Sequence, residues 1–252
     1  MKQKDLPDAN RRRVLAGGAG VAGLGLLGGA PALAADRIDH WDAETDVLVV
    51  GTGAAASAAA IFAREAGAAV AMVEKADYYG GTTAKSQGGY WIPNNHLMRG
   101  KGLVDERAAA LRYMARLSYP ELYNPDDARL GLAPDDHALI ATFYDHAARV
   151  VERLEALGAL HSTFFPGGAG FEYMPDYYGA RPENAAPYGR ILSPRLPDGT
   201  PGMGAEIARQ FEAAVRSRGI EVRFGQRAVR LVQAGGGAVV GVEVAAADGT
   251  TQ

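Results

Sequence analysis

The sequence predicts an α/β fold, in which helices cover a parallel β-sheet and a β-hairpin follows near the C-terminal end. Two short apolar runs, residues 46–50 and 70–73, flank an Ala-rich segment that stops at Gly67, which is a strand–helix–strand pattern. Helical spacing then recurs in residues 206–218 and strand-like residues in 220–224, and residues 229–232 and 239–244 alternate across three glycines. With 48% hydrophobic and 22% charged residues in 252, the composition is that of a packed core rather than a disordered chain.

Composition also excludes several classes of function. The formal net charge is -3 and no basic block lies beyond the first residues, so no nucleic-acid partner is predicted. Cysteine is absent, which excludes disulfides, thiolate zinc sites, cysteine-ligated iron–sulfur clusters and a cysteine nucleophile. His137 and His146 do not share a helix face with carboxylates, so we expect packing or surface roles for them and no metal site.

Residues 1–35 are predicted to be a targeting segment rather than part of the fold. Arg11, Arg12 and Arg13 precede an uncharged, Gly- and Ala-rich run over 14–35, which ends in a small-residue cleavage pattern. This segment resembles a twin-arginine signal peptide, which implies the twin-arginine export machinery as a partner and a location in the periplasm or otherwise outside the cytoplasm. An uncleaved membrane anchor and an exposed tail are the alternatives.

The strongest chemical signal follows the first predicted strand. Gly51, Gly53 and Ala56 form a G-x-G-x-x-A pattern at the start of a helix predicted over 54–66. In a Rossmann-like fold the first glycine allows a tight turn and the second lets a pyrophosphate approach the helix N-terminus. Glu74 ends the second strand, about 20 residues further on, where a carboxylate accepts ribose hydroxyls and disfavours NADP. The alternative is a structural Gly/Ala-rich turn.

A polar, Gly-rich segment over residues 75–89 distinguishes this chain from an ordinary NAD domain. We expect a long loop there, where an NAD domain would continue into a helix. Its paired glycines allow close backbone approach, and Thr82, Thr83 and Ser86 supply hydroxyl groups. A strand-like stretch and a turn follow over 90–95.

Residues 46–95 resemble the FAD-binding domain of the fumarate reductase and succinate dehydrogenase flavoprotein superfamily, which includes 3-ketosteroid dehydrogenases. The matching pieces are D-V-L-V-V-G-T-G, Glu74-Lys75, G-G-T-T-A-K-S-Q-G-G and W-I-P-N-N. The resemblance implies pyrophosphate contacts at Gly51, Gly53, Ala55 and Ala56, a ribose ligand at Glu74, and a further cofactor contact at Lys75. It implies contacts with the phosphates and flavin along Gly81, Thr82, Thr83, Ser86, Gly88 and Gly89. The backbone of Val229 matches an adenine contact, unless it is an ordinary strand valine.

The resemblance also implies the cofactor and the reaction. A covalently bonded histidine of some relatives matches Thr82 here, so we expect noncovalent FAD. The implied function is an exported FAD-dependent oxidoreductase that transfers a hydride between flavin and a C–C bond next to an electron-withdrawing group. A fumarate-like or 3-ketosteroid-like small molecule is the expected substrate, and an electron-transfer partner stays open. The alternatives are an NAD-dependent Rossmann dehydrogenase and a truncated product without activity.

Residues 36–252 are therefore expected to be the first part of an FAD-binding domain, apparently incomplete at the C-terminus because the family's A-T-G-G strand is missing. A helical and loop-rich segment is expected at about 103–201, with helices over 105–117 and 135–157. Aromatic residues in 159–201 either line a substrate-facing surface or pack as a loop, and we favour the loop: Phe164, Phe165, Tyr173, Tyr177 and Tyr178. The arginines of this segment, Arg181, Arg190 and Arg195, are not assigned to substrate, and no catalytic residue is assigned.

Overall fold

The computed structural model describes residues 40–246 except 169 and 187. The predicted signal peptide, with its anchor and tail alternatives, lies outside the described residues. Within the described part of the chain, no helix is long and apolar enough to cross a membrane.

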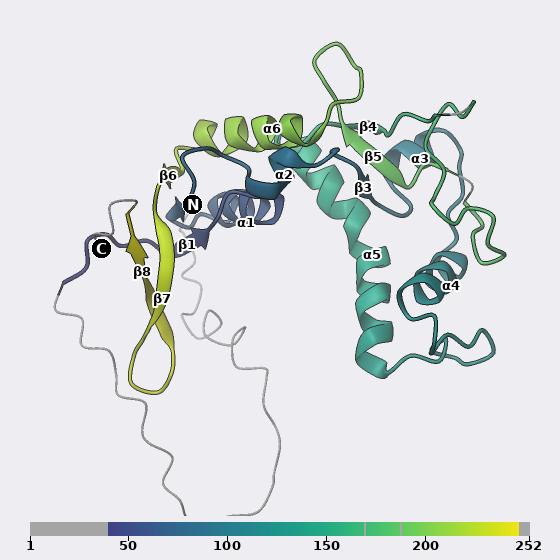
Figure 1. Cartoon of the computed structure of the whole chain (residues 1–252), viewed down its shortest axis with the longest axis horizontal. Helices are drawn as coiled ribbons and strands as arrows, with labels where there is room; N and C mark the ends of the chain where they lie inside the picture. The colour runs from purple at the N-terminus through teal and green to yellow at the C-terminus, as the bar shows by residue number, and fades with distance from the viewer. Residues whose placement is uncertain (1–39, 169, 187, 247–252) are drawn as a thin grey trace, which may run out of the picture.

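A three-stranded parallel sheet forms the first part of the fold, as predicted. Its strands β1 (Val47–Val50), β2 (Val70–Val73) and β6 (Glu221–Arg223) lie in the order β1-β2-β6. Helices α1 (Ala54–Glu65) and α6 (Gly204–Ser217) pack against each other beside this sheet (Figure 1). The sequential β1–α1–β2 crossover is the arrangement that the glycine motif requires.

The core between these elements explains why the two helices form. The predicted apolar face of α6 is buried along its length, at Ile207, Phe211, Ala214 and Val215. From α1, Ile61 joins the same cluster, and from the sheet, Met72 does. An amphipathic helix gains most of its stability from burying such a face. The helix predicted from the apolar spacing of residues 206–218 is therefore confirmed as α6.

A second, antiparallel sheet was not predicted in full. Strand β3 (Tyr90–Trp91) was expected, but β4 (Ser162–Phe164) and β5 (Ile191–Pro194) come from the segment expected to be a loop. The order is β3-β5-β4, and Leu192 pairs with both Tyr90 and Phe164. The rest of residues 159–201 consists of turns and loops, apart from isolated bridges, but the two strands within this segment were missed, because their partners lie far away in the sequence and periodicity does not show them.

Two longer helices lie beyond this sheet, close to their predicted positions. Helix α5 (Pro134–Ala156) carries two acidic residues in its first turn and ends before Gly158, whose φ is +66°. Helix α4 (Arg107–Ser118) begins two residues later than expected. Figure 1 shows α5 running from the second sheet to α4, against which its far end packs.

Two short helices were missed. Helix α2 (Gly81–Lys85) lies inside the predicted polar loop, so the expectation of a continuous loop over 75–89 is wrong. Gly80, with φ at +102°, redirects the chain so that this turn packs against α6. Helix α3 (His96–Gly100) begins after Asn95, whose side chain accepts a hydrogen bond from Met98 N at 3.0 Å, a standard N-cap.

The predicted hairpin is present as β7 (Arg227–Gln233) and β8 (Val239–Ala245), which pair in antiparallel fashion. In Figure 1 it lies away from α4 and α5, on the side of the parallel sheet. The register shifts between Ala228 and Arg230, so Val229 sits in a bulge of the ladder.

Candidate functional site

The turn from β1 into α1 has the geometry expected of an anion-binding crossover. Gly51 has φ +93°, a left-handed conformation that favours glycine. Gly53 is the N-cap of α1 and provides no side-chain cap, so the N–H groups of the first turn remain available to a ligand. One of them, Ala54 N, donates to Thr83 Oγ1 at 3.0 Å. The structure therefore brings the predicted Gly51, Gly53 and Thr83 together.

Glu74 lies at the end of β2 beside the same turn, and it is 5% exposed. Its Oε2 accepts from Thr52 N at 3.0 Å and from Thr52 Oγ1 at 2.7 Å, and its Oε1 accepts from Ala76 N at 2.9 Å. These three donors leave about one lone pair of the carboxylate for a ribose hydroxyl. The structure thus gives Glu74 a structural role that sequence reasoning missed, because Glu74 joins the end of β2 to the β1–α1 turn through Thr52.

The Gly-rich segment is held against the start of α6. Gly88, with φ +82°, approaches so closely that an added Cβ would lie 2.6 Å from Met203 C and 2.7 Å from Gly204 N. Gly204 N donates to Ser86 O at 3.1 Å, and Ser86 Oγ donates to Thr83 O at 2.8 Å. The close approach that the paired glycines predicted is real, but its partner within this chain is the backbone of α6.

The other predicted contact residues differ in how far they are exposed. Ala55, Lys75, Thr82 and Gly89 are exposed, and Gly81 is partly buried at the start of α2. Ala56 instead packs against the core beside the parallel sheet, as expected of the third small position. Val229 is 47% exposed on the hairpin. The turn before β7, the strand that carries Val229, is hydrogen-bonded to Glu74, because Gln226 N donates to Glu74 O at 2.8 Å.

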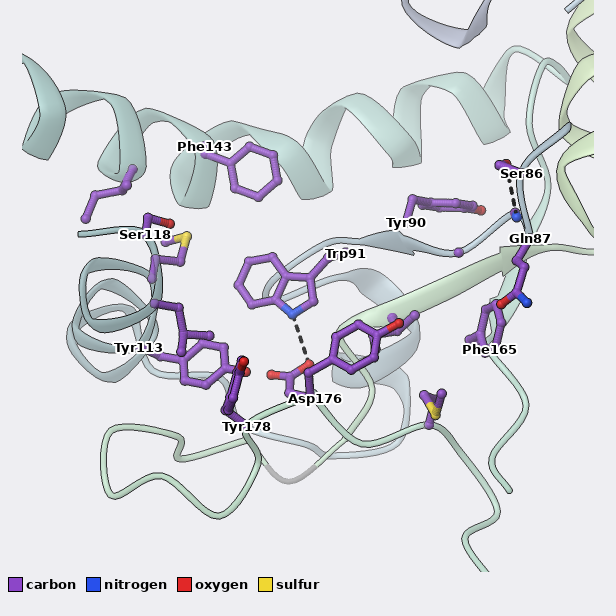
Figure 2. A pocket seen from close by; sticks show the side chains of 18 of the residues that line it. Ser86, Gln87, Tyr90, Trp91, Tyr113, Ser118, Phe143, Phe165, Asp176 and Tyr178 are labelled. Carbon is purple, nitrogen blue, oxygen red and sulfur yellow. Dashed lines mark hydrogen bonds between the residues drawn. The ribbon is translucent and has the colours of Figure 1, made fainter. Parts of the chain in front are cut away.

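A cavity of about 770 Å³ opens at the far end of the Gly-rich segment. Residues 86–89 form one end, and α4, α5, the second sheet and residues of the connection between β4 and β5 form the rest. Figure 2 shows Trp91 between Phe143 and Tyr113 in its wall. Seven aromatic side chains contribute to the lining: Tyr90, Trp91, Tyr113, Phe143, Phe165, Tyr177 and Tyr178.

The preference for a packed loop was wrong for three of the five predicted aromatic residues. Phe165, Tyr177 and Tyr178 line the cavity. Phe164 and Tyr173 do pack as expected, with ring centroids 4.5 Å apart. Phe164 lies in the strand β4 and is buried, whereas Tyr177 and Tyr178 are exposed.

Asp176 is the one charged residue among the described residues that line the cavity. Burial raises the pKa of Asp176 above its usual range, although hydrogen bonds and charge from Arg190 and a hydrogen bond from Trp91 oppose that effect. Arg190 is fully buried, whereas Arg181 and Arg195 are exposed. Among the described residues no group of three or more His, Cys, Asp or Glu could hold a metal ion.

Comparison with known proteins identifies the relatives of this site. Residues 46–252 match the family model described as an FAD binding domain. A 3-oxosteroid 1-dehydrogenase of Mycobacterium tuberculosis is 34% identical over 167 residues, which are 66% of this chain and 26% of that protein. A probable fumarate reductase of Shewanella frigidimarina is 29% identical over 201 residues, 79% of this chain and 29% of that protein.

Solved structures show the same fold. A 3-ketosteroid-Δ4-(5α)-dehydrogenase from Rhodococcus jostii superposes with a TM-score of 0.63 at 23% identity, over 85% of this chain and 44% of that one. A flavocytochrome c3 fumarate reductase superposes with a TM-score of 0.57 at 27% identity, over 80% of this chain and 30% of that one. This chain thus spans about a quarter of the length of the curated relatives, at 26% and 29%. The match over residues 46–252 nevertheless includes the β1–α1–β2 crossover and the Gly-rich segment, and the chain belongs to the FAD binding domain family, whose cofactor is FAD.

Proposed function

We propose that the protein is an FAD-dependent oxidoreductase that transfers a hydride between flavin and a C–C bond next to a carbonyl of a flat, uncharged substrate. The observation that carries the proposal is the aromatic cavity, which begins at residues 86–89 of the Gly-rich segment. A concave, largely apolar site with few polar groups is the usual form of a small-molecule site.

The residues around the first crossover fit FAD. The uncapped N-terminus of α1 would bind the diphosphate, and Gly53 has space in front of it because an added Cβ would meet only Thr83 Oγ1, at 3.5 Å. Glu74 would accept from a ribose hydroxyl with its remaining lone pair. When bound, flavin supplies the hydride acceptor or donor, and the chain's part is to bind and orient it.

The attachment of FAD is proposed to be noncovalent. Thr82 occupies the position that matches the covalently bonded histidine of some relatives, and its exposed hydroxyl lies on α2. An alcohol is a far weaker nucleophile than an imidazole at neutral pH. Acid precipitation of the protein is therefore expected to release all of the flavin into solution.

The cavity favours a 3-ketosteroid-like substrate over a fumarate-like one. A dicarboxylate needs arginine or another cation to replace its hydration, and none lies among the described lining residues. Arg190, whose guanidinium carbon lies 5.2 Å from the ring centroid of Trp91, is already paired with Asp105 and Asp176. The carboxylate of Asp176 would further repel an anion, whereas a neutral ring system would bury apolar surface against Trp91 and Phe143.

Export is a separate part of the proposal. The twin arginines and the uncharged run of residues 1–35 support passage through the twin-arginine machinery to the periplasm. Cell fractionation tests it. The native sequence is expected in the periplasm, and Arg11→Lys with Arg12→Lys is expected to keep the protein in the cytoplasm. Equal distribution of both proteins would contradict the proposal.

The reaction is tested on the purified protein under anaerobic conditions. We expect FAD to be the extracted cofactor, a 3-oxosteroid to bleach the flavin absorbance, and fumarate to leave the dithionite-reduced flavin unoxidised. Titration with a nicotinamide cofactor is expected to show no binding. A folded protein that neither retains nor rebinds flavin would contradict the proposal, and so would flavin that reacts with fumarate but not with the ketone.

A further inference from the structure

Arg190 makes the most completely buried ion cluster among the described residues. Its side chain and those of Asp105 and Asp176 are 0–1% exposed. The guanidinium is bidentate to Asp105, with Nε 2.9 Å from Oδ2 and Nη2 2.7 Å from Oδ1. Its Nη1 donates to Asp176 Oδ2 at 2.8 Å and to Asn184 Oδ1 at 2.9 Å. Four of the five guanidinium N–H donors are thereby used.

This cluster fixes the orientation of the aromatic wall. The guanidinium carbon lies 5.2 Å from the ring centroid of Trp91 and 5.0 Å from that of Tyr113. Trp91 is stacked nearly parallel to Tyr113, at 6.3 Å, and to Phe143, at 6.1 Å. Trp91 Nε1 donates to Asp176 Oδ1 at 2.9 Å, as the dashed line in Figure 2 shows. The carboxylate that Arg190 holds therefore sets the angle of the indole ring.

The same contacts anchor the loop that carries two exposed tyrosines. Arg190 binds Asp176 at one end of the loop and Asn184 at the other. Between them, Tyr177 is 87% exposed and Tyr178 is 55% exposed, and both line the cavity. Asn184 Nδ2 also donates to Gly179 O at 3.2 Å, which closes the loop on itself.

The composition of the cluster points to positioning rather than to stability. One arginine and two aspartates carry a formal charge of minus one, and taking such charges out of water is costly. Replacing a buried ion group by well-packed apolar residues often leaves stability unchanged or raises it. By contrast, no apolar side chain can replace a guanidinium group that holds three acceptor side chains at defined angles.

We infer that Arg190 is a positioning residue of the substrate cavity: through Asp176 and Asn184 it orients Trp91 and the loop that carries Tyr177 and Tyr178. The inference rests on the proposed function of that cavity. Arg190 does not line the cavity, so it acts on substrate through the residues that it holds.

The test compares two identical substitutions in the flavin-loaded protein. Arg190→Lys keeps the charge but loses the fork. Arg107→Lys is the control, because Arg107 is also bidentate, with Nε 2.7 Å from Asp145 Oδ1 and Nη2 2.8 Å from Oδ2, but the pair is exposed and neither residue lines the cavity. For Arg190→Lys we expect the KM for a 3-oxosteroid to rise on the order of tenfold with kcat changed less than about twofold, since a disordered wall weakens substrate binding. Arg107→Lys is expected to match the wild type.

Limited chymotrypsin digestion gives a second measurement that does not depend on activity. Cleavage at Tyr177 and Tyr178 is expected to be faster in Arg190→Lys than in Arg107→Lys, because the loop loses both anchors. If Arg190→Lys does not fold, Trp91→Phe takes its place, because it removes the N–H that reaches Asp176, together with part of the ring, and leaves Arg190 and both aspartates in place. It is expected to raise KM in the same direction by a smaller factor.

Two results would overturn the inference. The first is a folded, flavin-loaded Arg190→Lys protein whose KM and cleavage rate equal those of Arg107→Lys. The second is a Trp91→Phe protein with wild-type KM. Failure of the proposed function is seen separately, in the wild type, as missing flavin or as missing turnover of the ketone.

Discussion

Replacing Gly204 by alanine is expected to destabilise the protein and to displace the Gly-rich segment. An added Cβ would overlap Thr83 O and Ser86 Oγ and would lie 2.7 Å from Ser86 O. Two of these three atoms belong to backbone, so a rotamer change cannot relieve the overlap. Overpacking of this kind costs about 1–3 kcal/mol. Loss of the Gly204 N bond to Ser86 O, at 3.1 Å, would cost about 1 kcal/mol and offset the similar gain of about 1 kcal/mol in helix propensity.

Urea unfolding measures the net effect, which we expect to be about 1–3 kcal/mol in the free energy of unfolding. Gly100→Ala is the matched control, because Gly100 is also in a helix and an added Cβ there would meet nothing within 4 Å. That variant is expected to be as stable as the wild type or more so. A Gly204→Ala protein with wild-type stability would refute the claim that the segment is clamped on α6.

Two further predictions concern buried polar contacts. Thr52→Val removes the hydroxyl that donates to Glu74 and accepts from Gly80 N at 2.9 Å. It is expected to cost about 1–3 kcal/mol in urea unfolding, with Thr52→Ser close to wild type, and equal losses in both variants would contradict the hydrogen-bond account. Hydrogen bonds from Arg209 lower the pKa of Glu206 below its ordinary value of 4.5. Its contribution to stability is therefore present above about pH 5 and is lost as pH falls through the folded pKa. Glu206→Gln is expected to cost about 1 kcal/mol near pH 7 and progressively less as the pH is lowered below the ordinary pKa. A deficit that is independent of pH would contradict this.

The sequence predicted those elements whose signal is local. The β1–α1–β2 crossover, α4, α5, α6 and the hairpin each show a period or a turn within a short window. Strands β4 and β5 have three and four residues, and their partners lie far away in the chain: Ser193 pairs with Thr163 and Ile191 with Trp91. No window of sequence contains such a pair. Helix α3 could have been predicted from the sequence, because Asn95, its N-cap, is a residue type preferred at that position.

The candidate site divides in the same way. The glycines of the first turn and Glu74 were predicted because their motif has a fixed spacing. Thr52 was missed as the partner of Glu74, because its position in the motif accepts many residue types. The cluster of Asp105, Asp176 and Arg190 was missed because 85 residues separate Arg190 from Asp105, and a sequence does not show which of its charges are buried. The sequence singled out Tyr177 and Tyr178 as candidates for a substrate-facing surface, but only the fold shows that they line the cavity.

The central claim, that the crossover from β1 to α1 holds the diphosphate of FAD, is tested most directly by FAD titration of the purified Gly53→Ala protein. Gly53 has φ −65°, which alanine adopts, and an added Cβ would make only ordinary contact with Thr83 Oγ1 at 3.5 Å. Stability is therefore expected to stay within about 1 kcal/mol of the wild type. The Kd for FAD is expected to rise on the order of tenfold or more, since the new methyl group occupies the approach to the helix N-terminus. A Kd equal to that of the wild type would contradict the claim.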